Sequence, residues 1–153
     1  KNVKVAADAN EEMMLVGKID TKNEMVVDKA FAAQLPAKLT PDSSAHIALV
    51  SYKPNHLVYS FDSKTDQMAV FSEIYYDKGW NAYVDGKKMD YIRANYLLRA
   101  MPLHSGKYEI EFKFEPASYR IGNIIALTSS VLLVLSLLVF ALLQIKKLKQ
   151  QKK

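Results

Sequence analysis

The sequence predicts a mainly β fold, an antiparallel β-sandwich of the jelly-roll kind, followed by one C-terminal transmembrane helix. Residues 45–118 alternate apolar and polar side chains in short runs separated by turn residues, which is typical of antiparallel sheets. Residues 121–145 contain no charged side chain, and a lysine-rich tail follows them directly. These patterns predict a folded unit, a membrane span over residues 119–145 and a basic tail over residues 146–153.

Residues 1–44 are the least regular part of the chain, and we expect this irregular segment to belong to the same folded unit as the sandwich. Two apolar runs, residues 13–16 and 24–27, could be strands on either side of a turn. Residues 30–35 suit a helical turn before Pro36. An irregular connection is predicted up to residue 44, because each proline lacks an N–H donor and favours extended geometry in its predecessor.

Seven short runs predict the strands of the sandwich, residues 45–118. They are residues 45–52, 56–62, 67–74, 81–84, 87–91, 97–102 and 107–114. Asp85-Gly86 is the two-residue signal for a type I′ hairpin turn. In the last run Tyr108, Ile110 and Phe112 alternate with charged neighbours, so one face should pack in the core and the other should face solvent.

The span and its flanking charges predict an orientation in the membrane. A helix over residues 121–145 would be roughly 37 Å long at about 1.5 Å per residue, enough to cross a hydrocarbon core of about 30 Å. All 16 Asp and Glu precede Pro116, and five of the 21 Lys and Arg lie in the tail, so residues 1–145 have a net charge of 16 − 16 = 0. Because Lys and Arg collect on the cytoplasmic side, we expect a cytoplasmic tail and an extracytoplasmic sandwich. The alternative topology, a cytosolic domain with a tail anchor, would place the lysines outside.

Since the folded part has no basic excess, nucleic acid is not an expected partner.

The start of the chain has no apolar signal segment, so we expect earlier helices of a longer protein to carry the domain across the membrane. A cleaved signal peptide is the alternative.

Gly122, Ala126 and Ser130 recur every four residues on one helix face, and such small side chains let helices approach closely in lipid. The expected partners are therefore membrane lipid and other transmembrane helices of the same protein. The chain has no cysteine, which is ordinary for exported bacterial proteins.

The sequence contains no recognisable catalytic or metal-binding motif. His46, His56 and His104 lie in three different segments and no cysteine accompanies them, so neither a metal site nor a cofactor is predicted. The phosphate-binding glycine loop and the common nucleophile motifs are absent from the sequence. A pair of carboxylates could hydrolyse glycosides, but loop and hairpin positions explain the acidic candidates better. Those candidates are Glu73, Asp77, Asp85 and Asp90. No catalytic residue is therefore predicted in this segment.

An aromatic cluster over residues 75–83, joined by Tyr91 and Tyr96, is the most distinctive feature of the folded part. Trp and Tyr stack on sugar rings because they are large, rigid and polar at one edge. We therefore select four residues as possible glycan contacts, adding one side-chain amide for hydrogen bonding. They are Trp80, Tyr76, Tyr83 and Asn95. A core position between two sheets is the alternative for the tryptophan, which follows a glycine at the start of a strand.

At this cluster the chain resembles the C-terminal end of the YfhO-type bacterial membrane proteins, over about residues 45–145. Three stretches carry the resemblance: SEIYYDKGWNAYVDGK at residues 72–87, RANYLLRAMPL at residues 93–103, and SGKYEIEFKFEP at residues 105–116. In that family a tyrosine-rich turn ending in Gly-Trp precedes a hairpin, an Ala-Asn step and a final strand before the last helix. The family commonly has proline near Asp77-Lys78, and this chain does not.

The resemblance implies a large multi-spanning protein, similar to glycosyltransferases that use lipid-linked sugar donors, with this sandwich as its last extracytoplasmic part. The expected catalytic acid of that class lies in an earlier loop, so no catalytic residue is carried over to this chain. We therefore expect a binding or structural role in the glycosylation of cell-envelope glycans. The alternative is a single-span envelope protein whose sandwich binds a protein or carbohydrate partner.

Overall fold

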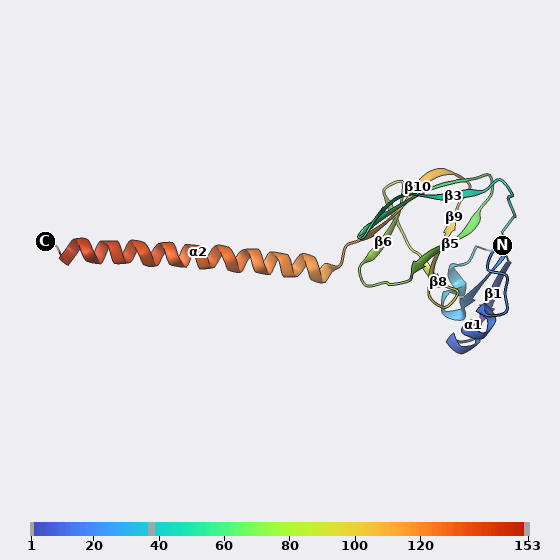
Figure 1. Cartoon of the computed structure of the whole chain (residues 1–153), viewed down its shortest axis with the longest axis horizontal. Coiled ribbons are helices and arrows are strands. Elements are labelled where there is room, and N and C mark those ends of the chain that lie inside the picture. The colour runs from blue at the N-terminus through green and yellow to red at the C-terminus, as the bar shows by residue number, and fades with distance from the viewer. Residues whose placement is uncertain (1, 37–38, 152–153) are drawn as a thin grey trace. The chain divides into compact units, whose positions relative to one another are not determined.

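The computed structural model describes residues 2–36 and 39–151 (Figure 1), in two compact units, Lys1–Phe114 and Glu115–Lys153. Ala37 and Lys38 of the predicted connection, and Lys152 and Lys153 of the predicted tail, lie outside the described residues. The elements of the first unit are β1 (Asn2–Ala6), α1 (Ala9–Val16), β2 (Glu24–Asp28), the 3₁₀ helix η1 (Lys29–Gln34), β3 (His46–Lys53), β4 (His56–Ser63), β5 (Gln67–Ile74), β6 (Trp80–Val84), β7 (Lys87–Met89), β8 (Ile92–Ala94), β9 (Leu98–Leu103) and β10 (Gly106–Phe114). The second unit contains α2 (Ala117–Gln151).

Two antiparallel sheets confirm the predicted mainly β fold. One sheet has five strands in the order β3-β4-β10-β6-β7, and the other has three in the order β5-β9-β8. The hairpin between β6 and β7 turns at Asp85 and Gly86, whose φ angles of 45° and 76° are both positive, as a type I′ turn requires. The predicted run 87–91 covers β7 only, and the short strand β8 follows it as a separate element.

The main core lies between the two sheets. Strands β4, β6 and β10 supply one wall and strands β5 and β9 the other, and the nine buried residues are Leu57, Phe61, Ala69, Phe71, Ala82, Met101, Leu103, Ile110 and Phe112. Phe112 is fully buried, and its ring contacts the rings of Tyr59, Phe71 and Tyr91. The alternation of the last strand therefore buries Ile110 and Phe112 as predicted.

A second core covers the opposite face of the three-stranded sheet. Its buried residues are Met25 and Val27 of β2, Met68 of β5, Ile92 and Ala94 of β8, and Ala100 of β9. In β5 and β9, neighbouring residues thus point to different cores: Met68 and Ala100 face the N-terminal elements, while Ala69 and Met101 face the five-stranded sheet. The three-stranded sheet is therefore the middle of three layers. The five-stranded sheet lies on one side of it, and the elements of residues 2–36, called here the N-terminal layer, lie on the other.

The N-terminal segment is more regular than the sequence pattern indicates. The prediction of a strand at residues 13–16 was wrong, because these residues end α1. The Asp8 side chain caps this helix by accepting hydrogen bonds from the backbone N–H groups of Asn10 and Glu11. The strand at residues 24–27 and the helical turn near residues 30–35 are confirmed as β2 and η1. Strand β1, which was not predicted, pairs in parallel with β2.

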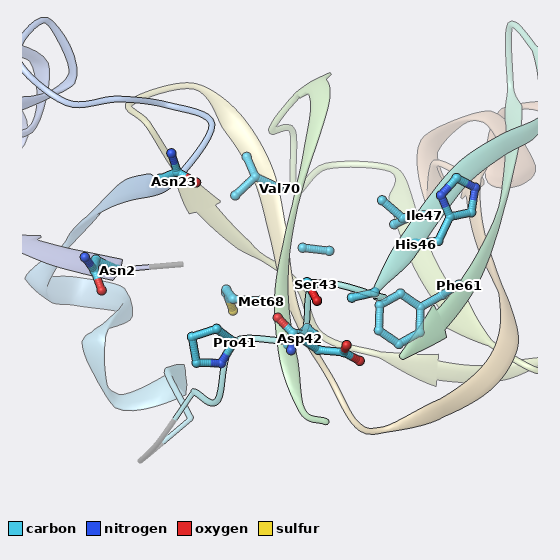
Figure 2. Close-up of a pocket in the computed structure, with 13 residues that line it drawn as sticks. Asn2, Asn23, Pro41, Asp42, Ser43, His46, Ile47, Phe61, Met68 and Val70 are labelled. Carbon is cyan, nitrogen blue, oxygen red and sulfur yellow. The ribbon is translucent and has the colours of Figure 1, made fainter. Parts of the chain in front are cut away.

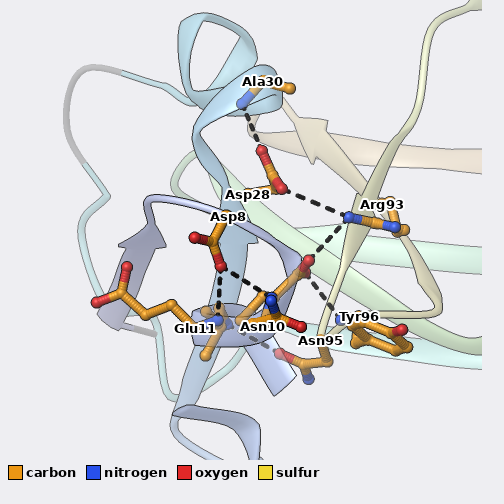
Figure 3. Close-up of polar contacts among 10 residues, drawn as sticks. Asp8, Asn10, Glu11, Asp28, Ala30, Arg93, Asn95 and Tyr96 are labelled. Carbon is orange, nitrogen blue, oxygen red and sulfur yellow. Dashed lines mark hydrogen bonds and ion pairs between the residues drawn. The ribbon is translucent and has the colours of Figure 1, made fainter. Parts of the chain in front are cut away.

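A buried polar network joins the N-terminal layer to the turn between β8 and β9 (Figure 3). Glu12 is fully buried, and its carboxylate accepts hydrogen bonds from Arg93 Nη2 at 2.9 Å and from the Tyr96 N–H at 2.8 Å. Asn95 forms two hydrogen bonds with Val26. The Asn95 Oδ1 accepts from the Val26 N–H at 2.9 Å, and the Asn95 N–H donates to the Val26 carbonyl oxygen at 2.8 Å. Asn95 and Tyr96 have φ angles of 49° and 71°, a left-handed conformation that these bonds hold in place.

A tyrosine hydroxyl fixes the turn that leads into β6. The Tyr91 hydroxyl lies 2.8 Å from the Tyr76 carbonyl oxygen and 3.2 Å from the Trp80 carbonyl oxygen, so it can donate to either end of this turn. Burial raises the pKa of Tyr91 to about 12, and the phenol therefore stays a neutral donor over the ordinary pH range.

Helix α2 is the one helix in the described part of the chain that is long and apolar enough to cross a membrane. The hydroxyls of Thr128, Ser129 and Ser130 each donate to the carbonyl oxygen four residues earlier, so these polar groups are satisfied within the helix, as lipid demands. A Cβ added at Gly122 would meet no atom within 4 Å. Packing of other helices against Gly122, Ala126 and Ser130 stays a prediction.

We predict that Glu12→Ala will lower the free energy of unfolding by about 3 kcal/mol, because it leaves the Arg93 guanidinium and the Tyr96 N–H without their buried acceptor. Urea denaturation of the full chain in detergent, followed by circular dichroism, measures this change. Glu109→Ala, at an exposed position on β10, is the control and should change the stability by no more than about 0.5 kcal/mol. Equal effects of the two substitutions would contradict the assigned role of Glu12.

We predict that Tyr91→Phe will cost about 1 kcal/mol of stability near neutral pH, because the turn loses its hydroxyl donor. The native pKa of Tyr91 is raised from 10.0 to about 12, so the stabilisation is complete below pH 10 and is lost as the pH rises through 12. In denaturation series between pH 7 and pH 12, the stability advantage of the parent chain over Tyr91→Phe should therefore shrink above pH 10 and disappear before pH 12. A constant difference across that range would show that the hydroxyl does not act in this way.

Candidate functional site

A pocket of about 400 Å³ lies where the predicted aromatic cluster meets the N-terminal layer. Four aromatic rings line it, together with side chains that can hydrogen-bond or carry charge. The lining residues are Phe31, Gln34, Tyr75, Asp77, Trp80, Asn81, Ala82, Lys88, Met89, Asp90 and Tyr91. This volume is within the usual range for small-molecule sites, and the mixture of rings and polar groups suits an amphipathic ligand.

Several separate segments build this pocket. Phe31 and Gln34 come from η1, Tyr75 and Asp77 from the turn after β5, and the other residues from β6 to Tyr91. Edge-to-face contacts join the segments: ring centroids lie 5.9 Å apart for Phe31 and Tyr75, and 5.4 Å apart for Tyr75 and Tyr91. Burial raises the pKa of Tyr75, so this phenol also stays neutral. The N-terminal layer therefore supplies part of the wall.

Trp80 is both a core residue and a wall of the pocket. Its half-buried ring lies 5.4 Å from the Phe114 ring, measured between centroids, and the Arg99 guanidinium carbon lies 4.3 Å from its centroid. Arg99 is 3% exposed, donates from Nε to the Ile74 carbonyl, and has its pKa lowered by desolvation. The cation fixes one side of the indole, while another part of the ring lines the pocket.

The other selected glycan contacts do not line this pocket. Tyr76 is 48% exposed and its carbonyl oxygen accepts from Tyr91, while Tyr83 lies on the opposite face of β6, with Lys113 Nζ 5.1 Å from its ring centroid. Asn95 is 7% exposed and its Oδ1 accepts the Val26 N–H. Of the four residues, the structure places only Trp80 in the wall. Contact between these residues and a glycan stays a prediction.

Two of the three histidines lie beside carboxylates. His56 Nε2 lies 2.7 Å from Glu111 Oε2, and His104 Nδ1 lies 3.1 Å from Asp66 Oδ2. Hydrogen bonding from Lys113, and then from His56, lowers the pKa of Glu111. Within residues 2–36 and 39–151, no group of three or more His, Cys, Asp or Glu side chains could hold a metal ion.

A second pocket, of about 530 Å³, lies beside strands β3 and β5 (Figure 2). Apolar side chains of these strands, including Ile47, Met68 and Val70, line it together with the loop Pro41-Asp42-Ser43. The Asp42 carboxylate accepts hydrogen bonds from Ser44, Ser63 and Lys64, which hold its pKa well below the usual range. This acid therefore anchors the loop.

Comparison with known proteins identifies the family. The protein described as "Uncharacterized protein YfhO" of Bacillus subtilis (strain 168) is 29% identical over 85 residues, which are 56% of this chain and 10% of that protein. The chain thus matches about a tenth of the length of this curated relative. No solved structure matches the chain. A sequence profile of the family described as "Bacterial membrane protein YfhO" matches residues 23–126, which include most of the folded unit and the start of α2. This chain therefore belongs to the YfhO family of bacterial membrane proteins.

Proposed function

We propose that this chain is the C-terminal extracytoplasmic domain and last membrane span of a polytopic, glycosyltransferase-like protein that acts on cell-envelope glycans. In this proposal the folded unit binds a glycan and does not catalyse its transfer. The observation that carries the proposal is the pocket in which Trp80, Tyr75 and Tyr91 stand beside the carboxylates of Asp77 and Asp90.

The side chains that line this pocket are complementary to a sugar ring. A pyranose has C–H groups that pack on aromatic faces and hydroxyls that donate to carboxylates, and the pocket offers both kinds of partner. Asp77 and Asp90 are exposed to solvent at the pocket and can accept from ligand hydroxyls. The rings contact one another and Trp80 is held by Arg99, so little side-chain freedom would be lost on binding.

The length of the relative and the basic tail support the membrane arrangement that we propose. The aligned residues are only 10% of the Bacillus protein, which leaves ample length for further membrane spans. Lys146, Lys147 and Lys149 follow the apolar part of α2, and lysines near the end of a span favour the cytoplasmic side. The folded unit would then lie outside the membrane, where envelope glycans are.

We predict that neutral mono- or disaccharides at millimolar concentration will change the fluorescence of Trp80, the only tryptophan of the chain. The double substitution Asp77→Ala and Asp90→Ala should weaken this binding at least about tenfold, because each carboxylate can accept a hydrogen bond worth about 1.5 kcal/mol or more. Titration of the full chain in detergent with a panel of sugars measures both effects.

Asp62→Ala is the matched control, since Asp62 is an exposed acid on β4 outside the pocket. It should leave sugar binding unchanged, and both the control and the double variant should melt at temperatures close to that of the parent chain. The absence of a response to every sugar would sink the proposal, and so would equal losses in the control and the double variant.

We predict that a membrane-impermeant maleimide will label Ser72→Cys in intact spheroplasts, and will label Gln150→Cys only after permeabilisation. The chain has no cysteine of its own, and both positions are exposed, so each variant gives one reactive site within these residues. Peptide mapping locates the label in the full-length protein. The reverse pattern would place the lysine tail outside and would refute the proposed orientation.

A further inference from the structure

One side of the sandwich is open, because an edge strand of each sheet lies there unpaired. Within the described residues, β3 pairs only with β4, and β5 pairs only with β9. The pocket of about 530 Å³ opens beside these edges (Figure 2). Ile47 of β3, Phe61 of β4 and Ala69 of β5 line it between the two sheets, while Met68 and Val70 line it on the face of β5 that points to the N-terminal elements. Unpaired N–H and C=O groups therefore stand beside a partly apolar hollow.

The five-stranded sheet is wider than the sheet that covers it, and β3 lies beyond the covered area. Ile47 and Tyr52 pair with Phe61 and Leu57 of β4, so they share the core-facing side of the sheet. Phe61 and Leu57 are 4% and 2% exposed, but Ile47 and Tyr52 are 39% and 65% exposed, and Leu49 between them is 50% exposed. Strand β3 thus has core-type side chains without the layer that would cover them.

The two edges of the five-stranded sheet differ in their protection against pairing. Strand β7 has only three residues, two of which are Lys87 and Lys88. Short length and lysine side chains are the usual means by which an edge avoids pairing with another strand. Strand β3 has eight residues and no charged side chain between His46 and Lys53. Its bulge between Leu49 and Ser51 adds Val50, which is also apolar and 62% exposed.

The occupant of this open side can be argued from the length of the family protein. The 85 aligned residues are 10% of the Bacillus relative, which gives it roughly 850 residues, so most of such a protein lies outside a chain of 153. We propose that an extended segment of the full-length protein, from outside residues 1–153, adds to β3 as an edge strand. Its alternate apolar side chains fill the pocket beside Ile47, Phe61 and Ala69. This inference shares with the proposed function the premise of a longer protein, but it does not depend on sugar binding.

Thiol labelling of Leu49→Cys tests the added strand. In the chain of residues 1–153, where Leu49 is half exposed, the thiol should react readily with a small water-soluble maleimide. In the full-length protein the rate should fall at least about tenfold, because the added strand covers this position. Lys87→Cys on the lysine-bearing edge is the control and should react equally in both proteins. Equal rates for Leu49→Cys in the two proteins would overturn the proposal.

Two other occupants would give different results. If a second copy of the chain covers β3, labelling of the short chain will slow as its concentration rises. If a lipid chain covers β3, labelling of the short chain will slow in lipid vesicles compared with detergent. Either result would overturn the added strand.

A stability measurement supplies an independent test: Leu49→Asp should lower the melting temperature of the full-length protein and leave that of the short chain nearly unchanged. Sugar binding measured on the same proteins shows separately whether the proposed function stands.

Discussion

The structure depends on the need to cover both faces of a three-stranded sheet. Strands β5 and β9 carry apolar side chains on both faces, so one layer cannot bury them. The five-stranded sheet covers one face, and β2 with η1 covers the other. Without the N-terminal layer, Met68, Ile92 and Ala100 would face water. Residues 2–36 are therefore part of the fold, and they also supply Phe31 and Gln34 to the aromatic pocket.

Apolar contact alone would leave the N-terminal layer free to shift, and the polar network restricts it. Burial of the Glu12 carboxylate carries a desolvation cost, which the Arg93 guanidinium and the Tyr96 N–H offset only when all three groups are correctly placed. Asn95 acts in the same way through its paired bonds to Val26, which resemble one step of a sheet ladder. Because these bonds have fixed geometry, they select one position of β2 against the β8–β9 turn, and hence one shape of the pocket.

The sequence allows the strands of the sandwich to be predicted because alternation and turn residues are local signals, and Asp85-Gly86 even indicates the turn type. Strand β1 is different, since it is short and acquires its partner β2 only through the helix between them. The site was predicted less well. Trp80 and Tyr83 are three residues apart on one strand, so they point to opposite faces, and of the two only Trp80 lines the pocket. Phe31 and Gln34 arrive through tertiary packing, for which the local sequence has no signal.

Arg99 explains why a core tryptophan can also be a wall of the pocket. This cation is 3% exposed, and its Nη1 has no hydrogen-bond partner among the described residues. Its charge is stabilised by the faces of Trp80 and Phe112, with guanidinium-to-centroid distances of 4.3 and 5.1 Å, and by the Ile74 carbonyl at the bulge in β5. A cation–π contact that is shielded from water contributes about 2 kcal/mol, which any rotation of the indole would forfeit. The contact that makes Trp80 a core residue therefore also holds its ring still for a ligand, so a core role and a binding role are compatible in the same side chain.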